Sequence, residues 1–432
     1  METDYTTRIL NYAVKTCGFY PLRPFQLALF DLQLNKAKST MLNMSYLLKI
    51  DNSIDLERLA KAINDTLNNY DIFRCRFMFH PGTNDLCQRF DGEIFPVKIE
   101  KISDEEFEIR KKNLVEPYQL ANAPLYRMKI FETPTKKYIY ADFHHSITDG
   151  LGAAVVFSYE IDSRYQGKIP KRTPLKYSDL ITQELLISPD ELAEGNKYWR
   201  EMFNGFDEKK HLPPADVEKT DFAREEIVFY NFKNITSNYF KEKSRNENNF
   251  FLAANMIAMA KSTKSKKVII SWLHSGRNTR KEYRIVGMML EQYPISWNFD
   301  ENMTVGEFLD GLDEKINFGM KYRRSLSAFY SQSMFADCVT FIFQKGAVNL
   351  HENNIVIGGK PTEFIELPAE ESFPRDNSLT FEFHAENSGN YSLEIAYVTT
   401  KYSEKFMQNF AESIDEIILN LKDENKKLGE IL

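Results

Sequence analysis

Apolar and polar positions alternate along the chain with two different periods. In residues 56–67, leucine, alanine and isoleucine recur every three or four positions, which places them on one face of a helix, and Ser53 or Asp55 is available as its N-cap. In residues 72–79, three phenylalanines and a cysteine alternate with two arginines, as in a strand with one buried face. The pattern therefore predicts a helix followed by a half-buried strand.

The C-terminal part of the chain predicts a hairpin and a closing helix. Residues 379–385 and 391–398 alternate on either side of N-S-G-N, whose residues tolerate positive φ, so they form an antiparallel pair. A stripe of apolar residues from Phe406 to Leu421 follows Ser403, which is a good N-cap. Strand and helix patterns alternate elsewhere too, which predicts a mixed α/β chain with antiparallel pairing.

A break in both periods predicts a boundary inside the chain. Between Gln166 and Asp179, one glycine and two prolines stand among four basic residues. Such a stretch continues neither a helix nor a strand. We therefore expect an N-terminal lobe over residues 1–175 and a C-terminal lobe over residues 176–432.

Composition narrows the classes of protein. The 432 residues include 55 basic and 62 acidic side chains, and the net charge of −7 has the wrong sign for a protein that neutralises nucleic-acid phosphates. The first ten residues lack the apolar core of a signal peptide, and no apolar run approaches the ~20 residues of a membrane span. The four cysteines are far apart, which fits a reducing compartment. We expect a cytoplasmic protein with no transmembrane segment and no nucleic-acid partner.

One motif concentrates the chemistry of the sequence. The strand pattern of residues 136–143 runs directly into H-H-S-I-T-D-G at residues 144–150, and an apolar helical pattern follows. Adjacent residues on a strand point to opposite faces, so His144 and His145 cannot share one role. A neutral imidazole can accept a proton from an attacking hydroxyl or amine. One of the two histidines is therefore a candidate general base.

The end of this motif offers further functional groups. Amides at a helix start lack helical partners, so those at Gly150 are candidates to stabilise negative charge. Asp149 has three possible roles: it can orient an imidazole, hold the loop through an arginine, or cap the helix. The other histidines show neither the spacing of metal ligands nor cysteine partners, and no nucleotide-binding signature is present, so no metal and no nucleotide cofactor are expected.

Several segments, in the same order, resemble the condensation domains of nonribosomal peptide synthesis. The wider superfamily includes chloramphenicol acetyltransferase and the alcohol acetyltransferases, and its members carry H-H-x-x-x-D-G. The similar segments cover nearly the whole chain. They are Tyr20–Gln26, Ile72–Phe77, Pro117–Arg127, Tyr198–Trp199, Ser275–Arg277 and Val286–Ile295.

The resemblance implies a fold and a role for each residue of the motif. In the family, two chloramphenicol-acetyltransferase-like lobes, each a two-layer α+β sandwich, form a V with a tunnel at their junction. By that match His145 faces the tunnel as the catalytic base and His144 faces the packed side. Asp149 pairs with Arg277 and braces one lobe against the other, so Arg277 gives structural support. Amides at Gly150 are the candidates to bind the oxyanion.

The implied reaction moves an acyl group from a pantetheine thioester to an amine or hydroxyl acceptor. No cofactor is bound permanently; the donor is linked to the phosphopantetheine of a carrier protein or to coenzyme A. A carrier-protein donor implies a condensation enzyme, whereas acyl-CoA implies an enzyme like the alcohol O-acetyltransferases. Degenerate condensation-type domains that recruit other enzymes are the alternative of another class, but they typically lose the paired histidines.

Two features of the chain qualify this resemblance. Where the family has F-V-N-T-L-P, residues 289–294 read M-L-E-Q-Y-P, which changes the polar groups expected near the acceptor. The 432 residues leave no room for an adenylation domain or a carrier domain. We therefore expect a stand-alone member of the family, with an acceptor that differs from the typical one.

Overall fold

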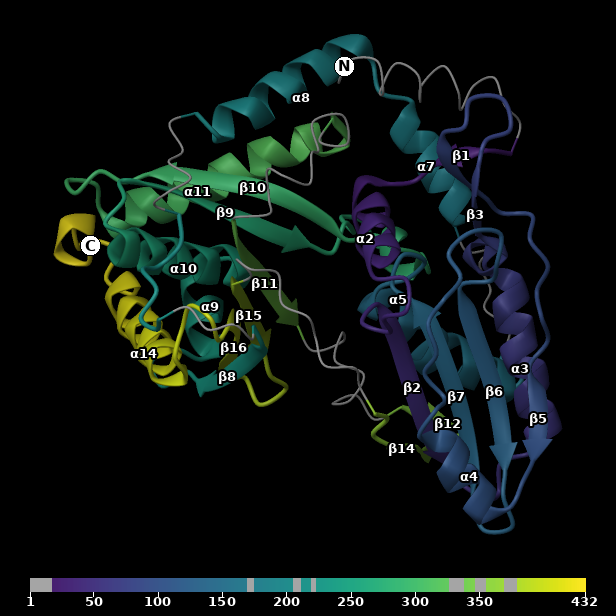
Figure 1. Cartoon of the computed structure of the whole chain (residues 1–432). Helices are drawn as coiled ribbons and strands as arrows, with labels where there is room; N and C mark the ends of the chain where they lie inside the picture. Colours follow the sequence, from purple (N-terminus) through teal and green to yellow (C-terminus); the bar gives the residue numbers. More distant parts are fainter. Residues whose placement is uncertain are drawn as a thin grey trace. The chain divides into compact units, whose positions relative to one another are not determined.

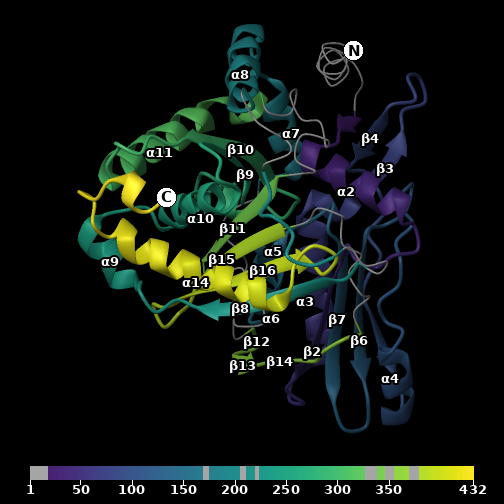
Figure 2. The same cartoon turned by 60° about the vertical axis from the view of Figure 1, so that its left-hand side comes forward.

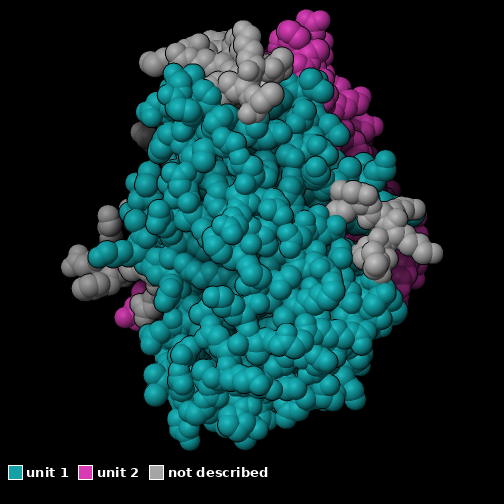
Figure 3. Space-filling view, turned by 90° about the vertical axis from the view of Figure 1, so that its right-hand side faces the viewer, with its two compact units in different colours: residues 1–186, 275–290, 347–371 teal, residues 187–274, 291–346, 372–432 magenta. Residues whose placement is uncertain are grey.

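The computed structural model describes residues 18–168, 175–204, 211–218, 223–325, 338–345, 355–368 and 379–432. These residues form two compact units (Figure 3). Unit 1 takes the described parts of residues 1–186, 275–290 and 347–371, and unit 2 takes those of residues 187–274, 291–346 and 372–432. Each unit therefore contains segments that are distant in the sequence.

Unit 1 is built on a five-stranded sheet with the order β14-β2-β7-β6-β5. β5 and β6 pair in parallel, and the other neighbours are antiparallel. The helix α3 runs along β5 (Figure 1). The strands are β2 (Asn43–Ile50), β5 (Lys98–Lys101), β6 (Tyr126–Glu132), β7 (Lys137–His144) and β14 (Glu363–Phe364). All residues of β7 after Lys137 are buried, including the polar side chains of Asp142 and His144, so both faces of this central strand are covered.

The remaining elements of unit 1 surround this sheet. A second, three-stranded sheet has the order β1-β4-β3, and β12 pairs with β13. The strands are β1 (Tyr20–Pro21), β3 (Arg76–Phe79), β4 (Leu86–Arg89), β12 (Val356–Ile357) and β13 (Lys360–Pro361). The helices are α2 (Pro24–Asn35), α3 (Leu56–Asn69), η1 (Asp71–Arg74), α4 (Asp104–Lys111), α5 (Gly150–Val155), the π-helix η2 (Val156–Ile161), α6 (Asp162–Tyr165), α7 (Tyr177–Leu185) and η3 (Glu282–Arg284).

The helix predicted over residues 56–67 is confirmed as α3. Asp55 is its N-cap, and the Asp55 carboxylate accepts a hydrogen bond from the backbone amide of Arg58 at 3.0 Å. The apolar stripe of the helix, including Leu59 and Ile63, is buried in the main core of unit 1. Amphipathic spacing and a cap therefore specify this helix together.

The strand predicted over residues 72–79 is only partly correct. Its first half lies in the 3-10 helix η1, and only Arg76–Phe79 form a strand. The backbone amide of Cys75 donates to the carbonyl of Ile72 at 3.0 Å, so the chain turns on itself before it joins the sheet. Within this turn the adjacent Ile72 and Phe73 are both buried, which an alternating pattern does not predict.

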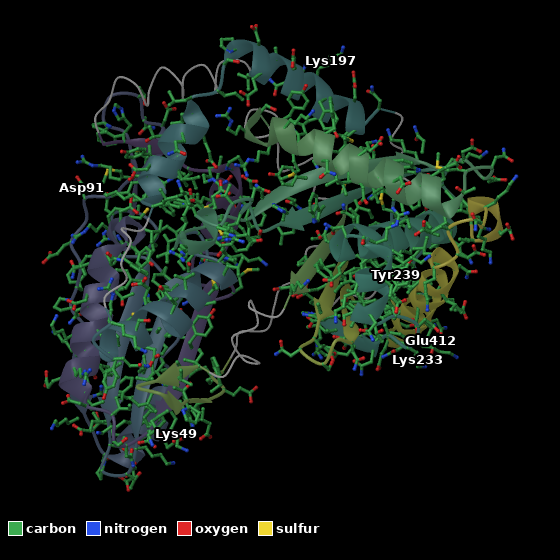
Figure 4. All side chains as sticks on the ribbon, turned by 180° about the vertical axis from the view of Figure 1, so that it is seen from behind. Lys49, Asp91, Lys197, Lys233, Tyr239 and Glu412 are labelled. Atoms are coloured by element: carbon green, nitrogen blue, oxygen red, sulfur yellow. The ribbon has the colours of Figure 1, made fainter. Side chains whose placement is uncertain are left out.

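Residues 355–368 add an edge strand to unit 1. The short strand β14 pairs with β2, with Glu363 opposite Lys49. The Lys49 ammonium, labelled in Figure 4, donates to the Glu363 carboxylate at 2.6 Å. Both side chains are exposed, so this ion pair contributes little to stability, and the backbone ladder holds the strand.

Unit 2 is built on a six-stranded sheet with the order β10-β9-β11-β15-β16-β8. β11 is parallel to both β9 and β15, and the other neighbours are antiparallel. The helices α10 and α14 pack side by side (Figure 2). The strands are β8 (Glu225–Asn231), β9 (Lys267–His274), β10 (Glu291–Asn298), β11 (Val339–Lys345), β15 (Leu379–Ala385) and β16 (Tyr391–Val398). The helices are α8 (Pro189–Met202), α9 (Ser237–Lys243), α10 (Glu247–Thr263), α11 (Val305–Gly319), η4 (Met320–Ser325), α14 (Glu404–Leu421) and η5 (Leu428–Glu430).

The C-terminal predictions are confirmed in unit 2. β15 and β16 form the predicted hairpin with the predicted bounds, and Gly389 in its turn has a φ of 86°, which an L side chain rarely adopts. The Ser403 hydroxyl accepts a hydrogen bond from the backbone amide of Phe406 at 3.1 Å and caps α14. Local patterning therefore determines this end of the fold.

The described structure keeps residues beyond 175 in unit 1. The backbone amides of Tyr177 and Ser178 donate to the Asp71 carboxylate at 2.9 and 3.0 Å, and the Tyr177 hydroxyl donates to the Met288 carbonyl at 2.7 Å. These bonds hold α7 and residues 275–290 within unit 1. Part of the predicted linker, residues 169–174, lies outside the described residues. The lobe boundary at residue 175, the V and the tunnel stay predictions.

Two further sequence expectations concern cysteines and membranes. Cys75, Cys87 and Cys338 are buried, whereas Cys17 lies outside the described residues. Among the described helices, none combines the length and the apolar composition that a membrane crossing requires.

Candidate functional site

The histidine motif fills the turn between β7 and α5. β7 ends at His144, and α5 begins at Gly150. The backbone amide of His145 donates to the Leu42 carbonyl at 2.8 Å, so the turn remains fixed to the segment that precedes β2. A Cβ atom on Gly152 would lie 2.4 Å from the Thr148 hydroxyl oxygen, so this position requires glycine. The turn is tight because its own side chains pack against the first turn of the helix.

His144 is fully buried and neutral. Its Nδ1 accepts hydrogen bonds from the hydroxyl of Ser146 at 2.6 Å and from the Ser146 backbone amide at 3.2 Å, which assigns the ring proton to Nε2. The ring of Tyr118 packs against it edge-on. Burial, with smaller contributions from His145 and Arg127, lowers the pKa of His144 to about 3. His144 therefore acts as a packed, uncharged side chain at neutral pH.

His145 lies in the opposite kind of environment. It is partly exposed, although the residues on both sides of it are buried. Its Nδ1 lies 3.0 Å from the carbonyl oxygen of Thr148, which can only accept a hydrogen bond, so Nδ1 carries the ring proton. In this tautomer the lone pair is on Nε2, and no residue in the described ranges donates to it. The imidazole is thus held in one orientation with a free proton acceptor.

Asp149 is the N-cap of α5 and the partner of Arg277. Its carboxylate accepts hydrogen bonds from the backbone amides of Gly152 at 2.8 Å and Met289 at 3.0 Å. Both terminal nitrogens of Arg277 also donate to it, at 2.7 and 2.9 Å. The two side chains are almost completely buried, at 1% and 0% exposure. Four N–H groups therefore surround one carboxylate.

Arg277 is held on its other sides by backbone carbonyls. Its guanidinium also donates to the carbonyls of Ser275 and Ile285, both at 3.1 Å. The sequence analysis placed Arg277 in the second lobe, but residues 275–290 belong to unit 1, as Asp149 does. The pair therefore fixes a loop onto unit 1, and the described structure gives no support to a bracing role between lobes.

Gly150 occupies the first position of α5 and is partly exposed. The Gly152 amide is already bound to the Asp149 carboxylate, and the Ala153 amide donates to the Asp149 carbonyl at 2.9 Å. The first-turn amides that these two bonds do not use are those of Gly150 and Leu151. A negatively charged oxygen at this helix start would meet those two donors.

A second buried carboxylate, which the sequence analysis missed, lies two residues before the histidines. Asp142 on β7 accepts hydrogen bonds from Ser45 and Asn43, both at 2.9 Å, and from Arg127 at 3.0 Å. Arg127 stacks over the ring of Tyr118, the residue that packs against His144. Arg127 ends the segment Pro117–Arg127 that carries part of the family resemblance, and this was the available signal.

Gln26 and Gln88 form a pair of glutamines that supports the histidine turn. The sequence analysis did not assign this role to them. The Gln26 amide donates to the Ser146 carbonyl at 2.9 Å. Its oxygen accepts from the backbone amide of Arg23 at 2.9 Å and from the side-chain amide of Gln88 at 3.0 Å. Both glutamines are fully buried. Gln26 ends the Tyr20–Gln26 segment of the resemblance, so that segment supports the turn that holds His144 and His145.

The part of the chain that the structure describes contains no cluster that could hold a metal ion. Such a cluster would need three or more histidine, cysteine, aspartate or glutamate side chains. The chemistry available at the turn is instead an oriented imidazole beside the amides of a helix start. Such an arrangement can accept a proton from a nucleophile and stabilise a developing oxyanion.

The chain was also compared with known protein families. Residues 16–431 match the condensation domain family. The chain belongs to this family. The matched residues include the H-H-x-x-x-D-G turn of this condensation domain and the motif segments that support the turn.

Curated relatives of this condensation domain are much longer proteins. The chain is 26% identical to surfactin synthase subunit 2 of Bacillus subtilis (strain 168) over 306 residues, which is 67% of this chain and 8% of that protein. It is 22% identical to tyrocidine synthase 3 of Brevibacillus parabrevis over 315 residues, 70% of this chain and 5% of that protein. For bacitracin synthase 3 of Bacillus licheniformis the identity is 23% over 304 residues, 68% of this chain and 5% of that protein.

Solved condensation domains and one X-domain share the fold. The condensation domain of the monacolin K polyketide synthase MokA superposes with a TM-score of 0.72 at 19% identity, covering 95% of this chain and 99% of that one. A mutant starter condensation domain of rhizomide synthetase RzmA, in complex with C8-CoA, gives 0.68 at 14% identity, covering 95% and 97%. The X-domain from teicoplanin biosynthesis gives 0.71 at 14% identity, covering 94% and 96%. The mixed α/β fold is therefore that of a condensation domain.

Proposed function

We propose that this condensation domain transfers an acyl group from a pantetheine thioester to an amine or hydroxyl, with His145 as the general base. The observation that supports this most strongly is the orientation of His145. Its Nδ1–H donates to the Thr148 carbonyl, so a free Nε2 lone pair is presented from a partly exposed ring. A base fixed in one tautomer does not have to reorganise when it accepts the proton.

The proposed reaction proceeds through a tetrahedral intermediate. The acceptor oxygen or nitrogen attacks the thioester carbonyl carbon while its proton moves to Nε2 of His145. Negative charge builds up on the former carbonyl oxygen, and the amides of Gly150 and Leu151 are the donors that α5 offers to it. The carbon–sulfur bond then breaks, and the imidazolium returns the proton to the pantetheine sulfur. The products are an ester or amide and a free thiol.

The other motif residues act through this imidazole. Among the described residues, Asp149 forms no hydrogen bond with the His145 ring; it holds α5 and Arg277 in place through four hydrogen bonds. His144 fills the space behind the turn without a charge. We assign to both residues the role of positioning His145 and the helix start, and to Arg277 the role of structural support.

The donor and the acceptor are defined here only by chemical class. The RzmA relative was solved with C8-CoA, and one further structure of that domain also holds Leu-SNAC. We therefore propose a donor linked to coenzyme A or to a carrier protein. Acyl-CoA with a hydroxyl acceptor corresponds to an alcohol O-acetyltransferase activity.

For the fold, we propose that the two units correspond to the two chloramphenicol-acetyltransferase-like lobes of the family.

Product analysis by intact mass tests the proposed function. The purified protein is incubated with acyl-CoAs and acyl-carrier proteins of several chain lengths, each with amine and alcohol acceptors. We expect at least one donor to yield an amide or ester together with free thiol. The absence of product from every combination, with a folded protein, would favour the alternative of a non-catalytic recruitment module.

The substitution His145→Ala tests the role of the base. We expect kcat to fall by about 10²–10⁴-fold, because a general base contributes that much to such a transfer. The melting temperature should stay close to that of the parent, since the ring is partly exposed and its single hydrogen bond is to the Thr148 carbonyl. His80→Ala, at another partly exposed histidine, is the matched control and should retain full turnover. Full turnover in the His145 variant would reject the assignment.

A further inference from the structure

A short basic loop follows Arg277 in unit 1. This loop, residues 278–284, contains three cationic side chains and one acidic one. The acid, Glu282, is 9% exposed, and its carboxylate accepts hydrogen bonds from the backbone amides of Asn278 at 2.7 Å and Thr279 at 2.8 Å. Glu282, the only carboxylate of the loop, therefore fixes the fold of the loop through these two bonds.

The three cations of the basic loop are exposed and unpaired. Arg280, Lys281 and Arg284 form no side-chain hydrogen bond or ion pair with any residue in the described ranges. Arg324 in unit 2 differs, because it makes two hydrogen bonds to Glu191 at 2.8 and 2.9 Å. Three positive charges against the single negative charge of Glu282, within five residues, contrast with the net charge of −7 of the whole chain. They form a local positive patch that attracts anions.

Both ends of the basic loop are fixed next to the histidine turn. Before the loop, Arg277 is held by Asp149; after it, the Ile285 carbonyl accepts a hydrogen bond from the same guanidinium at 3.1 Å. Within the loop, η3 contacts α5, the helix that begins at Gly150. After the loop, the backbone nitrogen of Gly287 lies close to α5: a Cβ atom added to Gly152 would be 3.4 Å from it. The basic loop is therefore fixed close to the proposed catalytic turn.

We propose that the basic loop binds the phosphate groups of the acyl donor. This inference rests on the proposed function, because the donor's pantetheine arm carries its phosphate at the end opposite to the thioester. Arginine guanidinium groups suit phosphate oxygens, since their planar N–H groups can make two parallel hydrogen bonds. Tyr283, which is 51% exposed between these cations, adds a hydroxyl donor and an aromatic face. The loop anchors the distal end of the donor while the thioester reaches the turn.

Calorimetric titration with coenzyme A tests the phosphate site without turnover. In the variant Arg280→Gln/Arg284→Gln we expect the Kd for coenzyme A to rise by about tenfold or more, which is the loss expected for two charge-assisted contacts. The Kd of the parent should also rise steeply with salt, and this dependence should weaken in the variant. A phosphopantetheinyl peptide, which carries one phosphodiester, forms the second arm and distinguishes a carrier-linked donor from coenzyme A.

Two controls make the test specific. The variant Arg58→Gln/Lys98→Gln removes two exposed cations elsewhere on unit 1 and should bind coenzyme A as the parent does. S-acyl pantetheine lacks phosphate, so the loop variant should turn it over at the parental rate. The proposal is overturned if the parent binds neither probe, if the loop variant keeps the parental Kd for both, or if it loses acyl-pantetheine turnover equally. Because binding is measured without acyl transfer, failure of one proposal does not entail failure of the other.

Discussion

Two aspartate–arginine pairs with buried carboxylates lie on either side of the paired histidines in the sequence, and they differ in the donors that surround the carboxylate. Asp149, after the histidines, accepts four hydrogen bonds, two from backbone amides and two from Arg277. Asp142, before them, accepts from a hydroxyl, a side-chain amide and one nitrogen of Arg127. The first set consists entirely of N–H groups that can never accept. The second set includes a hydroxyl that can reverse its role.

The burial of the two arginines differs as well. The side chain of Arg277 is completely buried, whereas that of Arg127 is 27% exposed and stacks over Tyr118. If its carboxylate partner is removed, Arg127 can reach water, but Arg277 cannot. A buried ion pair is costly to break when the remaining charge has no other partner. We infer that the Asp149 site requires a negative charge and that the Asp142 site requires only a polar side chain of that shape.

The largest expected effect is that of Asp149→Asn. The amide nitrogen of the new side chain would face N–H groups on either orientation, and the Arg277 charge would remain buried without a counter-charge. We expect the free energy of unfolding to fall by about 3–5 kcal/mol, together with a loss of acyl transfer. Denaturant unfolding measures this loss.

The substitution Asp149→Ala gives the matched comparison. It also removes the N-cap acceptor of Gly152, so it should destabilise the protein at least as much as Asp149→Asn. Full stability in the Asn variant would contradict the inference that the Asp149 site requires a negative charge.

Much of the fold was predictable because it depends on local patterns. The helix after Asp55, the hairpin of residues 379–398 and the helix after Ser403 were specified by spacing, turn residues and caps. The 3-10 helix at residues 71–74 was not, because its cause is distant: the Asp71 carboxylate is held by the backbone amides at the start of α7. Long-range bonds leave no periodic signal.

The site was predictable in its motif but not in its supports. The adjacent histidines and Asp149 stand out in the sequence, and strand geometry alone separates the environments of His144 and His145. Gln26 ends a segment of the family resemblance, but the sequence gives no partner for either Gln26 or Asp142. Their roles follow only from the bonds they make to Ser146 and Arg127. The polar supports of a site are therefore what sequence analysis most readily misses.

The pH dependence of stability is the next largest expected effect, and it distinguishes the two histidines. The folded-state pKa of His144, about 3, is depressed below its unfolded value of about 6.5. Its contribution to stability is therefore fully present above pH 6.5 and is lost as the pH falls toward 3. The slope is about 1.4 kcal/mol per pH unit, so about 2 kcal/mol should disappear between pH 6.5 and 5.

The variant His144→Asn measures this contribution. Asparagine keeps an acceptor for the backbone amide of Ser146 but does not titrate. Unfolding free energies at several pH values should show a shallower decline below pH 6.5 in this variant than in the parent. Identical slopes in the variant and the parent would contradict a buried, neutral His144.

The smallest expected effect is that of Asp142→Asn, the same substitution at the other anchor. Burial raises the pKa of Asp142, although the hydrogen bond from Ser45 and the positive charge of Arg127 act in the opposite direction. The free-energy cost of burying the Asp142 charge therefore exceeds the stabilisation from its partners. We expect a neutral side chain to be tolerated at this position. The amide oxygen can keep the bonds from Asn43 and Arg127, while the amide nitrogen donates to the hydroxyl of Ser45, which turns to accept.

We expect Asp142→Asn to change the free energy of unfolding by less than about 1 kcal/mol and to leave acyl transfer within about threefold of the parent. Denaturant unfolding and steady-state kinetics, run beside Asp149→Asn, measure both quantities. A loss of about 3 kcal/mol at Asp142 would show that Arg127, despite its partial exposure, needs a full counter-charge. In that case the two anchors would be equivalent, and both sides of the histidine turn would depend on buried charge.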